Sequence, residues 1–123
     1  MANSDKVIEA MMRPFVWGQC DCCLAVCDAL VAMGLPDPAA AYRGRYHCEE
    51  TARAVMGGSV EDVAEREGAR LGWPEVAPTL SRHGDVGVVQ NSLMLRLGSR
   101  WVGKSLKGIV VTKHVRRAWR PLA

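Results

Sequence analysis

The stretch Trp17-Gly18-Gln19-Cys20-Asp21-Cys22 leads directly into an apolar segment that ends at Met33. Apolar residues lie on nearly all sides of a helix drawn over residues 21–33, so we expect this helix to be central and buried. Gly34 follows at the place where a left-handed C-terminal cap belongs. The sequence therefore predicts a fold that assembles around residues 21–33.

Cys22 falls in the first turn of this predicted helix. Unpaired backbone N–H groups and the helix dipole at such a position favour a thiolate, and the cysteine nucleophile of papain-like enzymes usually lies there. Cys22, Cys23 and Cys27 can equally be small core residues, because free cysteine is among the most buried residue types. The spacing alone leaves both interpretations open.

A cysteine nucleophile needs a base, normally a histidine that the fold brings close to the sulfur. The chain has three histidines: His47, His83 and His114. Each of them can also be an ordinary surface residue. The candidate catalytic pair is Cys22 as nucleophile with His114 as base.

The cysteines also raise the question of a metal or iron–sulfur site. Ligand types are supplied by Cys20, Cys22, Cys23, Cys27, His47 and Cys48. Zinc ribbons and knuckles use paired C-x2-C spacings on turns, whereas these cysteines run into a helix on which Cys23 and Cys27 share one face. We expect neither a metal nor a cofactor, and a metal or iron–sulfur site is kept as an alternative.

The composition excludes several classes of protein. A length of 123 residues, 49% hydrophobic and 24% charged, is that of one globular domain spanning residues 1–123. No apolar run reaches the roughly 18 residues of a membrane span, and the first residues show no secretory signal. The five cysteines, an odd number, argue against a complete disulfide framework in a reducing compartment.

Charge is divided unevenly along the chain. Residues 1–80 carry seven Lys/Arg and twelve Asp/Glu, net −5, whereas residues 81–123 carry nine Lys/Arg and only Asp85, net +8. A basic half of this kind can face nucleic acid, an anionic partner or the chain's own acidic half. Trp101 and Trp119 lie among the basic residues, as in single-strand binding surfaces, but no known nucleic-acid-binding motif is present. We expect protein partners and no nucleic acid.

Helical signals fill residues 1–80 and strand signals fill residues 81–123. Capping and periodicity predict helices over 4–13, 21–33, 48–56 and 59–71. Short apolar or β-branched runs predict a meander of antiparallel strands at 85–90, 92–97, 100–102, 108–112 and 118–120. This order predicts an α+β fold with the helices packed on one side of the sheet.

These features, in this order, resemble the NlpC-type papain-like cysteine peptidases. The similarity rests on Trp17-Gly-x-x-Asp21-Cys22 opening a helix and on Gly84-Asp85-Val86 opening the strands. The chain is most similar to a small branch of that superfamily found in the tail gene modules of bacteriophages and gene-transfer agents, which shares Phe15–Cys22, Gly84–Val86 and a closing Ala118-Trp119-Arg120. The resemblance implies a papain-like fold with Cys22 at the nucleophile position.

The chain departs from the active members of that superfamily in one respect. Their catalytic histidine begins the strand after the Gly-Asp strand, and the matching stretch here, Asn91–Gly98, has no histidine. A missing general base costs about 10²–10⁴-fold in rate. The resemblance therefore implies a structural tail-tip or tail-assembly component, carried in the virion and assembled in the host cytoplasm, with other tail-tip or baseplate proteins as partners and a vestigial site at Cys22.

The leading alternative is a cysteine hydrolase that acts on peptidoglycan peptides. Cys22 is its nucleophile, and His114 or His83 is an unorthodox base. In the structural interpretation, by contrast, Trp17, Cys22 and the Gly84–Val86 turn hold the helix against the sheet and do no chemistry.

Overall fold

A computed structural model describes residues 4–122 of the chain. Its helices are α1 (Ser4–Met12), α2 (Leu24–Ala32), α3 (Glu49–Met56), α4 (Val60–Leu71) and the 3₁₀ helix η1 (Pro78–Leu80). Its strands are β1 (Glu75–Val76), β2 (Val86–Val89), β3 (Ser92–Leu97), β4 (Arg100–Ser105), β5 (Gly108–Thr112) and β6 (Arg117–Trp119). The predicted α+β order, helices first and strands second, is confirmed. No helix within residues 4–122 is long and apolar enough to cross a membrane.

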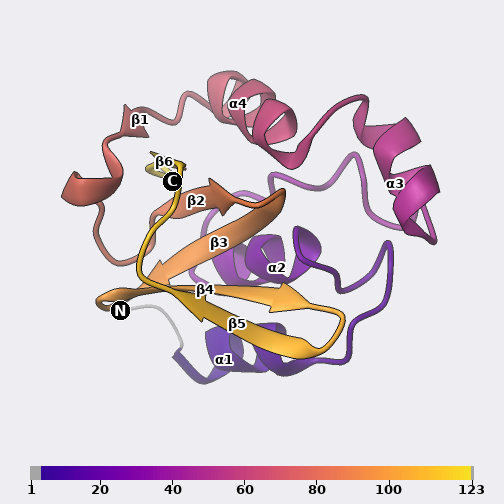
Figure 1. The fold of residues 1–123 in the computed structure, drawn as a ribbon, viewed down its shortest axis with the longest axis horizontal. Helices are drawn as coiled ribbons and strands as arrows, with labels where there is room; N and C mark the ends of the chain where they lie inside the picture. The colour runs from indigo at the N-terminus through magenta and orange to yellow at the C-terminus, as the bar shows by residue number, and fades with distance from the viewer. Residues whose placement is uncertain (1–3, 123) are drawn as a thin grey trace.

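The strands form one antiparallel sheet in the order β1-β6-β2-β3-β4-β5. Strands β2 to β5 make the predicted meander, but β6 does not continue it. The chain after β5 crosses back over the sheet and places β6 between β1 and β2 (Figure 1). The prediction of a meander through the last strand is therefore wrong, because its neighbour is set by long-range pairing of Trp119 with both Val86 and Glu75.

Two element boundaries differ from the prediction by three residues, and the other predicted boundaries lie within one residue of the observed ones. Helix α2 begins at Leu24 rather than at residue 21, because residues 21–23 form a turn that caps it. Strand β4 continues to Ser105, three residues beyond the predicted end at residue 102, because pairing with β5 holds Gly103 and Lys104 in the ladder despite their low strand propensity.

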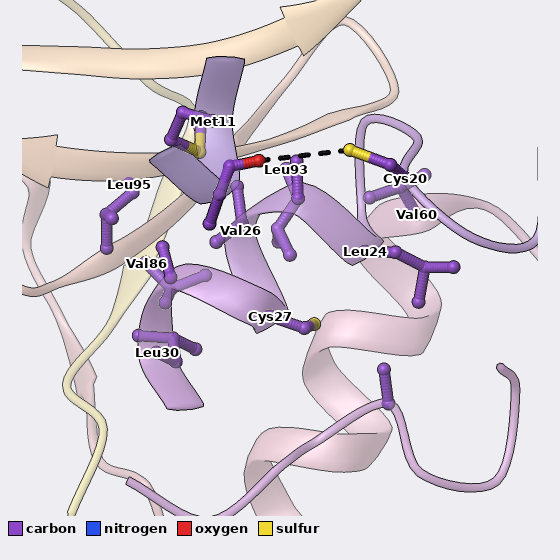
Figure 2. Close-up of a cluster of buried hydrophobic side chains, with 14 of the residues drawn as sticks. Met11, Cys20, Leu24, Val26, Cys27, Leu30, Val60, Val86, Leu93 and Leu95 are labelled. Carbon is purple, nitrogen blue, oxygen red and sulfur yellow. Dashed lines mark hydrogen bonds between the residues drawn. The ribbon is translucent and has the colours of Figure 1, made fainter. Parts of the chain in front are cut away.

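The main core lies between one face of the sheet and helices α1, α2 and α4. Helix α2 is buried on nearly all sides, with Leu24, Ala25 and Leu30 at most 1% exposed. Figure 2 shows α2 side chains facing Val86, Leu93 and Leu95 of the sheet. The predicted central helix and the one-sided packing of helices on the sheet are confirmed.

The opposite face of the sheet buries a smaller cluster of Met94, Trp101 and Ala118, against which Val115 of the β5–β6 connection packs. A Cβ atom on Gly87 would lie 2.9 Å from both the Trp101 ring and the Val115 side chain, so glycine makes room for this packing. Trp101 is only 1% exposed and Trp119 only 4%. These two rings therefore build the core and form no stacking surface for bases.

Gly18 joins two loops by direct backbone contact. Its φ is +79°, and a Cβ atom there would lie 2.0 Å from the carbonyl oxygen of Tyr46. Its own carbonyl accepts a hydrogen bond from the Gly44 N–H at 2.8 Å. Only glycine satisfies both constraints, so the loop before α2 is fitted against residues 44–46.

We predict that Gly18→Ala destabilises the fold far more than Gly34→Ala. Both glycines have a positive φ, but a Cβ at Gly34 meets nothing within 4 Å. Gly34→Ala should therefore cost about 1 kcal/mol from backbone strain alone, and Gly18→Ala about 4 kcal/mol because the Tyr46 backbone must also move. Urea unfolding of both variants measures the difference, and equal losses would contradict the contact.

Candidate functional site

The carboxylate of Asp21 is 1% exposed and joins three segments of the chain. It accepts hydrogen bonds from the backbone N–H groups of Gly18 at 3.1 Å, Cys23 at 3.0 Å and Leu24 at 3.0 Å, and from the Tyr46 hydroxyl at 2.6 Å. Two of these donors belong to the first turn of α2, whose unpaired N–H groups Asp21 satisfies. The charge thus fixes the start of α2 to the loops on either side.

Tyr46 and Trp17 complete this arrangement. Burial, together with the hydrogen bond to Asp21, raises the pKa of the Tyr46 hydroxyl far above its ordinary value, so the hydroxyl stays protonated and remains a donor. Trp17 packs edge-on against the rings of Phe15 and Tyr46, at centroid distances of 5.0 and 6.5 Å. The Trp-Gly-x-x-Asp part of the motif is therefore structural.

Cys22 lies beside this junction in an open cleft of about 390 Å³, which we call the Cys22 cleft. The cleft is lined by residues that include Trp17, Cys22, Arg53, Asn91, Ser92 and Lys104. The start of α2 therefore faces the start of β3 across the cleft, as a nucleophile and its base would have to do.

The immediate surroundings of Cys22 favour a thiolate. A hydrogen bond from the Cys23 thiol, whose sulfur lies 3.9 Å away, lowers the pKa of Cys22, while burial and the Asp21 carboxylate oppose it. The backbone N–H of Leu93 and the hydroxyl of Ser92 lower the pKa further. The same hydrogen bond and burial raise the pKa of Cys23 well above its ordinary value, so the thiolate forms at Cys22.

None of the three histidines lines the Cys22 cleft. His114 is exposed in the β5–β6 connection, His47 is exposed before α3, and His83 is exposed with its Nδ1 accepting a hydrogen bond from the Gly98 N–H at 3.0 Å. The structure therefore does not bring the candidate base His114 to Cys22. It brings Ser92, which begins β3 and which the sequence analysis did not single out.

The other cysteines point to separate places. The Cys20 thiol donates to the Ala10 carbonyl (Figure 2), Cys27 is buried in the main core, and Cys48 contacts Thr51 at the start of α3. Burial raises the pKa of Cys20 and raises that of Cys27 far above its ordinary value, whereas hydrogen bonds from Thr51 lower the pKa of Cys48.

The metal alternative finds only part of a ligand set. Within residues 4–122, one group of three donors converges, with ligand atoms of Asp21, Cys22 and Cys23 within 4.8 Å of one another. The Asp21 oxygens already accept the four hydrogen bonds described above. The geometry therefore offers two thiols and does not assemble the four ligands of a structural zinc or iron–sulfur site.

Two buried charged side chains, Lys104 and Asp85, make contacts that hold parts of the fold together. The ammonium of Lys104, in a side chain only 4% exposed, donates to the Met11 carbonyl at 2.9 Å and ties β4 to the end of α1. The buried Asp85 carboxylate accepts from the Arg120 guanidinium at 3.0 and 2.8 Å and from the Arg82 N–H at 2.9 Å. Asp85 is therefore a turn carboxylate that is paired with an arginine.

The two charged halves of the chain partly neutralise each other. Arg117 pairs with Glu75 at 2.8 Å and Glu65 at 3.1 Å, and Arg116 pairs with Glu61 at 3.0 Å. These contacts join β6 and the segment before it to α4 and β1. Part of the basic charge is therefore directed at the chain's own acidic half.

Comparison with known proteins gives one match. The sequence model of a family described as a domain of unknown function (DUF6950) matches residues 3–121, nearly the whole chain. No curated protein and no solved structure matches it.

We predict that iodoacetamide at neutral pH alkylates Cys22 and Cys48 first and the other three cysteines only after unfolding. A lowered pKa raises the thiolate fraction at a given pH, so the rate at Cys22 should level off at a lower pH than for an ordinary thiol. Peptide mass spectrometry of timed samples measures each site, with Cys22→Ser as the control that removes one fast site. Equally rapid labelling of Cys27 would contradict its burial.

Proposed function

The chain belongs to the DUF6950 family, and we propose that it is a structural component of a bacteriophage-type tail tip with a degenerate NlpC-like fold. In this proposal it is assembled in the host cytoplasm, is carried in the virion and contacts other tail-tip or baseplate proteins. Its Cys22 cleft is a remnant that does not hydrolyse peptides.

The proposed relationship to NlpC-type peptidases is supported by where the motifs lie. Cys22 is in the turn that opens the central helix α2, and Gly84-Asp85 opens the first strand of the meander. The cleft then lies between the start of α2 and the start of β3, which is the strand on which active members carry their histidine. These positions support the proposed relationship.

The proposal rests on the residue that lies across the cleft from Cys22. Ser92 begins β3 there, lines the same cleft, and lowers the pKa of the Cys22 thiol through its hydroxyl. A hydroxyl has neither the basicity nor the proton affinity to serve as general base near neutral pH. A thiolate can therefore form in this cleft, but none of the three histidines lines it to protonate a leaving group.

The contacts of the motif residues indicate that these residues hold the fold together. Gly18, Asp21 and Asp85 make contacts that hold loops, helix and sheet together, and none of these contacts needs a substrate. The fold keeps these contacts although Cys22 has no general base. Such a fold suits an assembly role, because a rigid domain can present surfaces to neighbouring proteins without catalysing a reaction.

The alternative, a cysteine hydrolase acting on peptidoglycan peptides, is favoured by one observation. Cys22 has a lowered pKa in a cleft that is open enough to admit an extended peptide. Its base would have to come from outside the cleft, since His83 and His114 do not line it.

We predict that Ser92→His restores an activated cysteine. An imidazole on the first residue of β3 would stand beside the Cys22 sulfur and stabilise its thiolate as an ion pair, raising the alkylation rate near pH 6 by about tenfold. Ser92→Phe is the matched control, since it supplies a planar ring without a nitrogen. Equal rates in the two variants would contradict the placement of Ser92 next to Cys22.

We predict that the protein is present in purified particles at a fixed ratio to the tail proteins, and that Cys22→Ala leaves both its incorporation and DNA delivery unchanged. Quantitative mass spectrometry and a transduction assay measure these outcomes, with Gly18→Ala as a variant that fails to be incorporated because its fold is damaged. Absence of the wild-type protein from particles contradicts the assembly role. Normal incorporation with loss of delivery in Cys22→Ala would instead support the hydrolase.

A further inference from the structure

Strand β5 is an open edge of the sheet. It pairs with β4 alone and stands last in the strand order. Within residues 4–122, its residues Gly108–Thr112 make no backbone hydrogen bond to any segment other than β4. In an antiparallel pair, alternate N–H and C=O groups of an edge strand point away from its partner, so β5 presents a row of unpaired backbone groups.

The side chains of β5 suit strand pairing. Ile109, Val110 and Val111 are β-branched and 39%, 39% and 57% exposed. Successive residues of a strand point to opposite faces, so apolar side chains are available on both faces of an added strand. Figure 1 shows β5 next to β4 at the end of the sheet, with α1 below it.

The other edge of the sheet, strand β1, is unsuited to pairing with a further strand. Strand β1 has only two residues, and Pro74 and Pro78 flank it closely. Short edge strands and prolines prevent further pairing. The two edges therefore differ, and only β5 offers a length on which another strand can add.

The charge at the ends of β5 selects the partner. Lys107 precedes the strand and Lys113 follows it, with Arg100 at the start of β4 next to that end. Within the described residues, none of these three cations forms an ion pair, whereas Arg116 and Arg117 are paired with glutamates. Three exposed cations without an ion pair in the described part of the chain thus lie together at this edge.

A second copy of the chain is a poor occupant. Two β5 strands paired antiparallel about Val110 would set Lys107 of each copy opposite Lys113 of the other, and like charges directly opposite are destabilising. A strand with acidic residues at both ends has the complementary charge, and its central side chains can be β-branched.

We propose that the β5 edge docks an extended segment of another tail protein by strand addition, and that this segment has an apolar, β-branched centre and acidic ends. The inference rests on the assembly role proposed above, for which it names the partner's chemistry. The segment extends the sheet beyond β5 through main-chain hydrogen bonds, and Lys107 and Lys113 set its register.

The test uses two acetylated, amidated peptides with the same alternating Val/Thr centre, one with glutamates and one with lysines at the ends. Titration into ¹⁵N-labelled protein should shift the amides of β5, with the glutamate peptide binding about tenfold more tightly at low salt and the preference shrinking as salt is added. The double variant Lys107→Glu/Lys113→Glu, at exposed positions, should reverse the preference.

Three results would overturn the docking inference: no shift in β5 with either peptide, equal affinity for both, or self-association of the free protein through β5. These outcomes are separate from the particle experiment. Failure of peptide docking with the protein still present in particles refutes the β5 site alone, whereas absence from particles refutes the assembly role even if the peptides bind.

Discussion

The fold depends on a buried negative charge. Asp21 lies at the point where the N-terminal loop, the first turn of α2 and the loop at Tyr46 meet, and its four donors come from all three. A buried carboxylate is tolerated only when its oxygens are fully hydrogen-bonded, so these segments must occupy their positions together. Asp85 plays the corresponding part at the other side of the sheet, where it joins the β2 turn to Arg120.

Under the proposed function, the same junction lets the geometry around Cys22 persist without hydrolysis. Asp21 orients the turn that carries Cys22, and the backbone at Leu93 lies against the sulfur. Both are fixed by interactions that stabilise the fold. Under the proposal, the general base depends on a single side chain, the one at position 92. No packing contact requires a histidine there, and this chain has Ser92. A change at residue 92 alone can therefore remove the base and leave the fold intact.

Local signals predicted much of this structure. Strands β3 and β5 have the predicted bounds, since Asn91 and Gly98 delimit the apolar run of β3 and Gly108 begins the β-branched run of β5. Strand β1 was not predicted because Glu75 and Val76 carry no strand signal and are ordered by pairing with β6. The sequence alone would place Lys104 on the surface. It is buried because its ammonium donates to the Met11 carbonyl at the end of α1, 93 residues earlier in the chain. The place of Ser92 beside Cys22 likewise follows from tertiary packing.

The insertion of β6 between β1 and β2 has a consequence for how the molecule is built. Residues 117–119 are needed before β1 has any strand to pair with, and Arg120 is needed before Asp85 has its cation. The β1 side of the sheet is thus completed by β6, the last strand in the sequence. Such non-local pairing is slow to form, and a nascent chain that lacks this segment would leave one edge of β2 unpaired.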